Sequence, residues 1–286
     1  MIDGKLAFVI LTWNSEAYIR TCLESILSLQ TKQPIQIYLS DNGSADGTIA
    51  ILKEYATVYK EQAHIYFSPN NEGTTKPRNR LLRMIPEDTD WICVLDSDTV
   101  IYQEAMERLV SALENHPNAM LASPRMWTNN REEQMSCKRF PTVCGKIMKA
   151  FPLANVQGKA ARKESYPFFP SGDNSGNPPV SSDSTCYQAD YAISACWMLR
   201  SSVRKHVGYL DEYYLYAPED VDYCASIWEN GYEVLFVSGA SIIHDTQRLS
   251  HKKRLSTLNQ AHIKGLIHYF KKFRYISRPK MRSSGE

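Results

Sequence analysis

The first 125 residues alternate between short apolar runs and amphipathic segments, and this alternation limits the folds open to the chain. Short apolar runs bounded by turn residues indicate buried strands, and apolar residues at helical spacing indicate helices. The expected strands are residues 6–11, 35–39, 64–67, 91–95 and 119–123. Strands that alternate with helices form a parallel sheet with right-handed crossovers. We therefore predict an α/β fold with a mostly parallel sheet flanked by helices.

The helices between these strands carry start signals. Ser15 and Glu16 can cap the first helix, and Pro77 fits the first turn of the third. The apolar face of the first helix is expected to be Tyr18, Cys22, Ile26 and Leu29. The second helix is expected from Asp46 to about Tyr55, and the fourth from Gln103 to Asn115.

The second half of the chain is less regular. Residues 127–186 contain six prolines and a stretch rich in Gly, Ser, Asn and Asp, so we interpret them as an irregular insertion that forms a mobile loop over the site. Further elements are expected as a strand at 187–199, a helix at 219–230 closed by Gly231, and strand pieces at 233–237 and 240–243. We assign residues 1–245 to one domain and 246–286 to a helical extension.

Polar clusters follow four of the expected strands. They are Thr12, Trp13 and Asn14; Asp41, Asn42, Gly43 and Ser44; Asn71, Glu72 and Gly73; and Asp96, Ser97 and Asp98. Each cluster alone is explained by ordinary turn chemistry. In a parallel sheet, however, all four strand ends lie on one edge, where ligands of open α/β sheets bind. We therefore predict one crevice lined by these clusters.

Asp96 and Asp98 are the most informative pair, because they follow the buried run Trp91–Leu95 directly. Two carboxylates at a strand end suit a hard divalent cation, which in turn suits a phosphate group. The alternative is that the pair only caps the following segment, since short motifs often occur by chance.

Two downstream groups can complete such a site. Asp220, beside Glu219, opens the expected helix; acids there can complement the helix dipole, but a carboxylate at a crevice is also a natural general base. His244 ends the last expected strand. A single histidine is more often structural, yet imidazole together with carboxylate suits Mn²⁺.

The ordered set of these motifs resembles the family 2 glycosyltransferases of GT-A fold. It is most similar to the rhamnosyltransferase-like branch of bacterial polysaccharide assembly, above all in residues 208–212, 219–224, Gly231, Tyr232 and His244. The resemblance covers residues 5–125 and 187–245 well and 127–186 poorly. No single motif is specific, but their order is. A Rossmann-like sheet with a small antiparallel portion is the implied fold.

The resemblance implies a role for each motif. The nucleotide-sugar donor would be bound by Thr12, Trp13, Asn14, Asp41, Asn42, Ser44, Asn71, Gly73, Asn79, Asp96 and Ser97. Asp98 and His244 would ligate Mg²⁺ or Mn²⁺ on the donor diphosphate. Asp220 would be the catalytic base, held by Glu219, in a one-step displacement that inverts the anomeric centre. The donor would be a UDP-, dTDP- or GDP-linked sugar, rhamnose being one candidate. The acceptor would be a glycan or a lipid-linked saccharide used in cell-surface polysaccharide such as lipopolysaccharide O-antigen.

One stretch departs from the family pattern. Residues 74–78 are bulkier and more basic than the small residues usual there. Lys76 or Arg78 can contact a phosphate, or can simply form a solvated helix start.

Composition places the protein in the cytoplasm, at most peripheral to the inner face of the plasma membrane. No apolar stretch approaches the ~20 residues that span a bilayer, and the start lacks the features of a signal peptide. The seven cysteines form no CxxC pair, which favours reduced thiols.

Charge is unevenly distributed. Residues 246–286 hold eleven Lys/Arg against one acid, Glu286. Apolar and aromatic residues recur there near helical spacing, as in basic amphipathic helices that bind anionic membranes. The alternative is a helix that packs on the domain. No nucleic-acid motif is recognisable.

Two other functions compete with the transferase. A sugar nucleotidyltransferase should have a Gly-rich, Arg-containing loop after its first strand, where Thr12–Ser15 stands instead. A non-catalytic protein of the same fold, binding nucleotide or membrane, should have lost the carboxylates, which are present.

Overall fold

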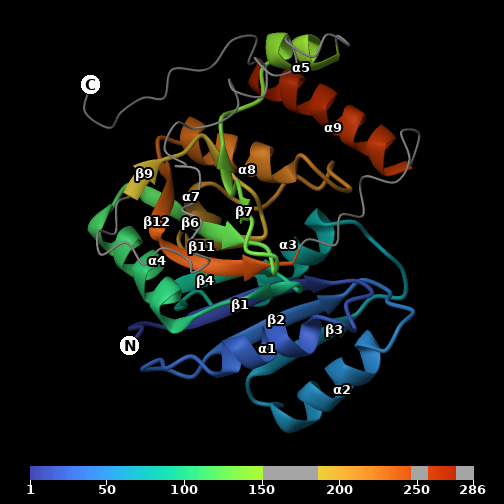
Figure 1. Cartoon of the computed structure of the whole chain (residues 1–286), viewed down its shortest axis with the longest axis vertical. Helices are drawn as coiled ribbons and strands as arrows, with labels where there is room; N and C mark the ends of the chain where they lie inside the picture. The colour runs from blue at the N-terminus through green and yellow to red at the C-terminus, as the bar shows by residue number, and fades with distance from the viewer. Residues whose placement is uncertain (151–185, 246–256, 275–286) are drawn as a thin grey trace.

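The computed structural model of the protein describes residues 1–150, 186–245 and 257–274, and it consists of one large sheet between layers of helices (Figure 1). The strands of this sheet are β1 (Leu6–Thr12), β2 (Gln36–Asp41), β3 (Ala63–Phe67), β4 (Trp91–Asp96), β5 (Thr99–Val100), β6 (Ala119–Trp127), β7 (Glu133–Gln134), β9 (Cys186–Gln188), β11 (Cys196–Arg200) and β12 (Glu233–His244). A separate antiparallel pair is formed by β8 (Cys137–Lys138) and β10 (Tyr191–Ala192).

Helices cover both faces of the large sheet. The helices of the described residues are α1 (Ile19–Leu27), α2 (Thr48–Val58), α3 (Thr75–Met84), α4 (Gln103–Asn115), α5 (Val143–Ala150), α7 (Val203–His206), α8 (Glu219–Glu229) and α9 (Thr257–Phe273). The buried residues of α1, α2 and α4 pack on one face, and those of α3, α7, α8 and α9 on the other. The predicted α/β class is confirmed.

The sheet has the strand order β3-β2-β1-β4-β11-β6-β12-β5. β3, β2, β1 and β4 are mutually parallel, as predicted. β11 then runs antiparallel to both β4 and β6, and β12 is parallel to β6. The sheet is therefore mixed, with its parallel half carrying the four polar clusters at one edge.

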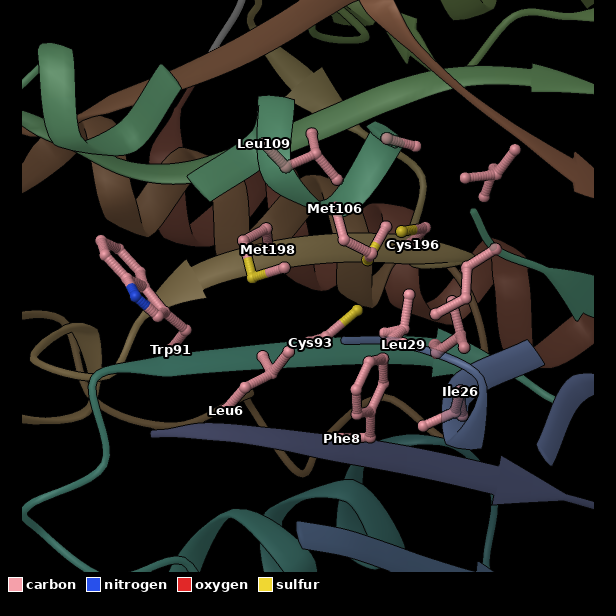
Figure 2. Close-up of a cluster of buried hydrophobic side chains, with 14 of the residues drawn as sticks. Leu6, Phe8, Ile26, Leu29, Trp91, Cys93, Met106, Leu109, Cys196 and Met198 are labelled. Atoms are coloured by element: carbon pink, nitrogen blue, oxygen red, sulfur yellow. The ribbon is translucent and has the colours of Figure 1, made fainter. Parts of the chain in front are cut away.

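The central strands are buried on both faces, so alternate residues feed two cores. Leu6 and Phe8 of β1 and Cys93 of β4 point to the α1/α4 side (Figure 2), whereas Ala7 and Val9 join the core under α3 and α8. Both-sided burial explains the near-continuous apolar runs of these strands. It also makes the strand ends rigid supports for the polar loops that follow them.

The start of α1 differs from the prediction. The helix begins at Ile19 after Tyr18, and no side chain caps it. Ser15 instead accepts the first helical N–H groups through its carbonyl oxygen. The carboxylate of Glu16 accepts a hydrogen bond from Gly47 N (2.9 Å). The predicted Ser15 and Glu16 caps are therefore wrong, because tertiary partners occupy these side chains.

The strands in the second half of the chain also differ from the predicted ones. Residues 187–199 form three short strands rather than one, and the two pieces expected at 233–237 and 240–243 are the single strand β12, with a register shift between Val237 and Ser241. The part of the expected irregular insertion that is described, up to residue 150, contains β7, β8 and α5. The remainder, 151–185, lies outside the described residues, as do 246–256 and 275–286 of the C-terminal extension.

The described part of that extension, α9, packs on the domain. Tyr269 is fully buried, and Phe270 and Phe273 pack against the same core. Ile263 and Ile267 are exposed, at 58% and 50%. Among the described residues, no helix has the length and apolar character to cross a bilayer.

Candidate active site

The loops after β1 and β2 hold each other through side chains predicted to bind the donor. Asn14 donates its backbone N–H to Ser44 Oγ (2.8 Å), and its side-chain oxygen accepts from Ala45 N (2.8 Å). Asp41 is fully buried and accepts hydrogen bonds from the backbone N–H and hydroxyl of Ser44. Asn14 adopts a positive φ of 50°, which asparagine tolerates better than most residues. Asn14, Asp41 and Ser44 thus shape this edge.

Thr12 and Trp13 differ in exposure. Thr12 is buried, and its hydroxyl has no hydrogen-bond partner among the described residues. Trp13, in the loop after β1, is 40% exposed. An exposed indole on a rigid loop is available for stacking, and an unpartnered buried hydroxyl is a group that a ligand or water can satisfy.

Asn42, Asn71 and Gly73 form a hydrogen-bonded unit beside this loop. The Asn42 amide donates to Asn71 Oδ1 (3.0 Å) and to the Gly73 carbonyl (2.9 Å). Gly73 has a φ of +83°, and a Cβ there would lie 2.2 Å from the carbonyl oxygen of Leu215. Only glycine fits this contact.

Asn79 connects α3 to residues 210–212. It is fully buried in α3, and its amide bonds both Leu210 (2.8 Å to the carbonyl) and Glu212 (2.9 Å). Asn79 thus holds the segment that precedes α8.

Asp96, Asp98 and His244 come together where β4 ends. His244 lies opposite Thr99 in the β12–β5 pair, and Asp245 N donates to the Asp98 carbonyl (2.9 Å). His244 Nε2 is 3.4 Å from Asp98 Oδ1. Candidate ligand atoms of Asp96, Asp98 and His244 all lie within 4.8 Å of one another. Strand pairing thus unites residues almost 150 positions apart in sequence.

The donor set of this cluster fits a divalent cation. The side-chain oxygen of Gln134 lies 2.7 Å from His244 Nδ1. Because an amide oxygen only accepts, Nδ1 carries the hydrogen and Nε2, which faces Asp98, is left as the ligand nitrogen. Burial lowers the pKa of His244, but the hydrogen bond and charge of Asp98 outweigh this and raise it overall. A cation that binds Nε2 would therefore have to displace the proton that Asp98 favours there.

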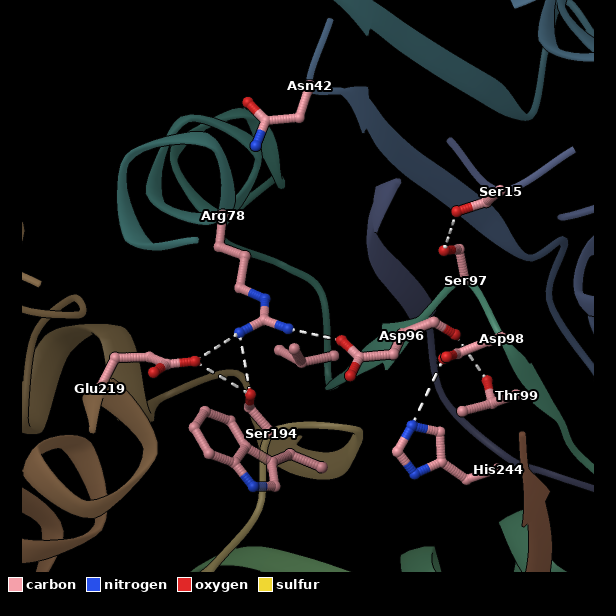
Figure 3. Close-up of polar contacts among 12 residues, drawn as sticks. Ser15, Asn42, Arg78, Asp96, Ser97, Asp98, Thr99, Ser194, Glu219 and His244 are labelled. Carbon is pink, nitrogen blue, oxygen red and sulfur yellow. Dashed lines mark hydrogen bonds and ion pairs between the residues drawn. The ribbon is translucent and has the colours of Figure 1, made fainter. Parts of the chain in front are cut away.

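Arg78 joins Asp96 at the end of β4 to Glu219 at the start of α8. Its guanidinium contacts Asp96 Oδ1 (2.6 Å), Glu219 Oε1 (3.2 Å) and Ser194 Oγ (2.9 Å), as Figure 3 shows. Its side chain is 3% exposed. Burial and Asp98 raise the pKa of Asp96, whereas Arg78 opposes the increase. Glu219 is thus held by Arg78 and Ser194.

Asp220 begins α8 next to Glu219. Its carboxylate accepts the N–H of Val221 (2.8 Å). Burial and the negative charge of Glu219 raise the pKa of Asp220 to about 7. A carboxyl group with a pKa near the working pH is suited to general-base catalysis. Asp220 is only partly exposed.

Ser97 supports the opposite side of the Asp-x-Asp turn. Its hydroxyl is 2.8 Å from the hydroxyl of Ser15, and both are buried. This bond ties the turn after β4 to the loop after β1.

The sequence patterns did not identify two residues of the site, and they assigned a third residue a different role. Gln134 lies in a region predicted to be irregular, and Ser194 lies in an expected strand, so nothing marked either. Arg78 was predicted either to contact a phosphate or to form a solvated helix start. The solvated alternative is wrong for Arg78, because its side chain is buried and contacts two carboxylates. The partners of a buried arginine cannot be read from spacing along the chain.

Comparison with known proteins identifies the family. The profile of the family described as "Glycosyl transferase family 2" matches residues 7–208. The chain belongs to this family, which confirms the resemblance drawn from its motifs.

Several relatives share parts of the sequence. The chain is 24% identical over 253 residues to the N-acetylglucosaminyl-diphospho-decaprenol L-rhamnosyltransferase of Mycobacterium tuberculosis, with 84% of this chain and 75% of that protein covered. It is 28% identical over 135 residues to Glycosyltransferase GlyA of Streptococcus pneumoniae and 32% over 103 residues to the Minor teichoic acid biosynthesis protein GgaA of Bacillus subtilis. These matches cover 47% and 35% of this chain but only 18% and 23% of those two proteins.

Solved structures share the fold. A structure of GalNAc-T7 with UDP, GalNAc and Mn²⁺ matches with a TM-score of 0.67 at 15% identity, covering 94% of this chain and 48% of that one. The mannosyltransferase PcManGT of Pyrobaculum calidifontis, in complex with GDP-Man and Mn²⁺, matches with a TM-score of 0.61 at 14% identity, covering 98% and 67%. These likenesses establish the GT-A fold.

Proposed function

We propose that the protein is a metal-dependent, inverting glycosyltransferase that moves a sugar from a nucleotide-diphosphate donor to a hydroxyl group of a glycan or lipid-linked saccharide. The observation that carries this proposal is the junction of Asp96, Asp98 and His244 with Asp220 through Arg78 and Glu219. Arg78 contacts both Asp96, one of the candidate cation ligands, and Glu219, the neighbour of the candidate base, which supports a single site for cation and base.

In this proposal Asp220 accepts the proton of the acceptor hydroxyl. The oxygen of that hydroxyl attacks the anomeric carbon of the donor sugar on the side opposite the diphosphate. The new bond to the acceptor forms as the bond to the diphosphate breaks, so the configuration inverts. Asp98 and His244 would hold Mn²⁺ or Mg²⁺, and the ion would neutralise charge on the leaving diphosphate. Arg78 holds Glu219 beside the base and Asp96 beside the cation.

The donor side is assigned to the loops after β1, β2 and β4. Trp13, which is exposed, is placed to stack on a flat ring, and Asn14, Asp41, Asn42 and Ser44 shape the pocket around it. UDP-, dTDP- and GDP-linked donors are the candidates. The mycobacterial rhamnosyltransferase relative favours a rhamnosyl donor and a lipid-diphosphate saccharide acceptor, as in cell-surface polysaccharide synthesis.

A thermal-shift series with UDP, dTDP and GDP, each with and without Mn²⁺, tests this proposal. A ligand at 100 times its Kd stabilises a fold by ~2.7 kcal/mol. One nucleotide should raise the melting temperature, and only with Mn²⁺. Asp98→Ala should abolish the metal-dependent shift. If no nucleotide shifted the wild type, or if Asp98→Ala shifted equally, the metal-dependent donor site would be refuted.

The same series separates the competing functions when sugar transfer is assayed beside it. Metal-dependent nucleotide binding without transfer to saccharide acceptors would favour the non-catalytic binding protein. Release of diphosphate from a nucleoside triphosphate and a sugar phosphate would favour the nucleotidyltransferase.

We further propose that the protein works at the inner face of the plasma membrane, where a lipid-linked acceptor would be found. The basic character of residues 246–286 and the exposed Ile263 and Ile267 of α9 support this placement. Packing of α9 on the domain is compatible with it, because those two side chains face away from the core.

A further inference from the structure

α9 packs against the segment of residues 211–218, which leads directly into Glu219 and Asp220. The ring of His268 stacks on Tyr213 with centroids 3.9 Å apart, and its Nε2 lies 3.0 Å from Asp211 Oδ2. A ring nitrogen of His262 lies 3.2 Å from the carbonyl oxygen of Ala217. Contacts therefore occur at both ends of the segment.

A glycine allows the closest approach between α9 and this segment. A Cβ at Gly265 would lie 2.8 Å from Pro218 Cδ and 3.1 Å from Tyr214 Cδ1. Pro218 is the residue before α8. This close contact with α9 therefore limits how far the start of α8 can move toward α9.

An ion pair between Lys272, whose side chain is 35% exposed, and the buried Asp222 joins α9 to α8 itself. Lys272 Nζ lies 2.7 Å from Asp222 Oδ2 and 3.0 Å from Asp222 Oδ1. Asp222 is 2% exposed and also accepts the hydroxyl of Tyr214 (2.8 Å). Lys272 is the cation that compensates this buried carboxylate, which lies two residues after the base.

The segment in turn contacts the donor side. The hydroxyl of Thr75 donates to the Tyr214 carbonyl (2.6 Å), and Thr74 N donates to the Leu215 carbonyl (2.8 Å). The carbonyl of Leu215 is the atom against which Gly73 packs. Residues 211–218 are therefore held between α9 and the loop before α3.

We infer that α9 positions the catalytic base, with Lys272 as the positioning residue that fixes the first turn of α8 through Asp222. This inference rests on the proposed role of Asp220. A catalytic group at the start of a helix stays in position only when the segment that leads into it is held by the scaffold, and small displacements of a reacting group cost large factors in rate. Undocking α9 would release the base but leave the donor loops after β1 and β4 intact.

Two substitutions test this inference from opposite directions. Lys272→Met removes the cation, and Gly265→Ala inserts a methyl group between α9 and Pro218, although alanine favours the helix itself. Each should lower kcat by roughly 10-fold to 10²-fold while leaving the KM for the donor unchanged. Lys272→Arg should restore most of the rate, because it retains the charge.

The control is Lys205→Met, which removes one exposed lysine from α7 and should not change kcat. Equal loss of kcat and donor affinity in Lys272→Met would mean a general structural role and would overturn the inference. Wild-type kcat in Gly265→Ala and Lys272→Met would overturn it as well.

Amide hydrogen exchange of the full chain gives a readout that does not depend on turnover. Peptides covering 211–222 should exchange faster in Lys272→Met and Gly265→Ala, whereas peptides of β1 and β4 should not change. Unchanged exchange in peptides covering 211–222 would refute the inference that α9 holds this segment in place. Absence of sugar transfer by the wild type would instead refute the proposed function, so the two failures are distinguishable.

Discussion

At the scale of single residues, Asp220 has the properties of a general base. Its pKa is raised to about 7 by burial and by the neighbouring Glu219. Asp220→Asn retains the shape of the side chain but cannot accept a proton. We expect kcat to fall by roughly 10²–10⁴-fold with donor binding retained. Normal turnover by this variant in a sugar-transfer assay would exclude Asp220 as the base.

The same pKa fixes the expected pH dependence. The carboxylate is the active form, and the pKa is raised, so the ionised fraction falls as the pH drops below about 7. The rate should therefore be constant at higher pH and should decline tenfold per unit on the acid side. Asp220→Asn should lose this acid limb. An acid limb near pH 4 in the wild type would mean that the carboxyl group is solvated during turnover.

Removal of Arg78 should cost several kcal/mol of stability, about 3–5 kcal/mol. Arg78 is 3% exposed and compensates both Asp96 and Glu219. Removing one partner of a buried ionic cluster leaves uncompensated charge, at a cost of about 3–5 kcal/mol. We expect Arg78→Met to lower the free energy of unfolding in urea by this amount.

An exposed pair supplies the matched control for Arg78. Arg20 pairs with Glu54 on the surface, where the two side chains are 45% and 55% exposed. Such pairs contribute about 0–1 kcal/mol, so Arg20→Met should change the urea midpoint little. Similar losses in the two variants would show that the Arg78 cluster is not a buried ionic network.

At the scale of elements, the contact between the Gly73 loop and residues 211–218 joins the loop after β3 to the segment that leads into α8. Gly73→Ala places a Cβ 2.2 Å from the Leu215 carbonyl at a positive φ. Positive φ alone costs a non-glycine residue ~1–2 kcal/mol. We expect a larger loss of stability than this, together with weaker donor binding.

Gly231→Ala separates conformational cost from steric clash. Gly231 has a φ of +81°, but a Cβ there would meet no atom within 4 Å. Its substitution should therefore cost only the ~1–2 kcal/mol of positive φ. If Gly73→Ala and Gly231→Ala lowered the free energy of unfolding equally, the Gly73 loop would have to shift and relieve the steric clash.

At the scale of the whole molecule, positive charge is concentrated in residues 246–286. This concentration favours binding of the C-terminal extension to an anionic membrane. Each Lys or Arg near such a surface contributes ~1 kcal/mol. We expect the protein to co-sediment with vesicles containing phosphatidylglycerol but not with neutral ones. Because Tyr269 of α9 is buried in the core, deletion of the extension would disturb the fold, so point substitutions are the better test.

Ile263→Ser combined with Ile267→Ser should weaken vesicle binding about tenfold, since two exposed apolar side chains are lost from the interface. Val58→Ser is the control, because Val58 is also exposed, at 66%, but lies on α2. Absence of wild-type binding to either kind of vesicle would refute the membrane proposal.

The pattern of apolar residues was sufficient to predict the parallel half of the sheet. β1, β2 and β4 are buried on both faces, so local hydrophobicity and turn residues specify them without knowledge of their partners. The same patterns located the polar loops at one edge. The caps proposed for Ser15 and Glu16 failed because hydrogen bonds to distant loops compete with local ones, and no periodicity reports that competition.

By itself, the sequence determined the fold class, the family and the identity of Asp96, Asp98, Asp220 and His244 as site candidates, because these depend on strand ends and on the order of motifs. Only the tertiary structure decided which side chains meet. Arg78 between Asp96 and Glu219, Gln134 on His244, and Lys272 on Asp222 are all long-range pairs. Such pairs depend on strand order and helix packing, and neither is encoded in the spacing of residues along the chain.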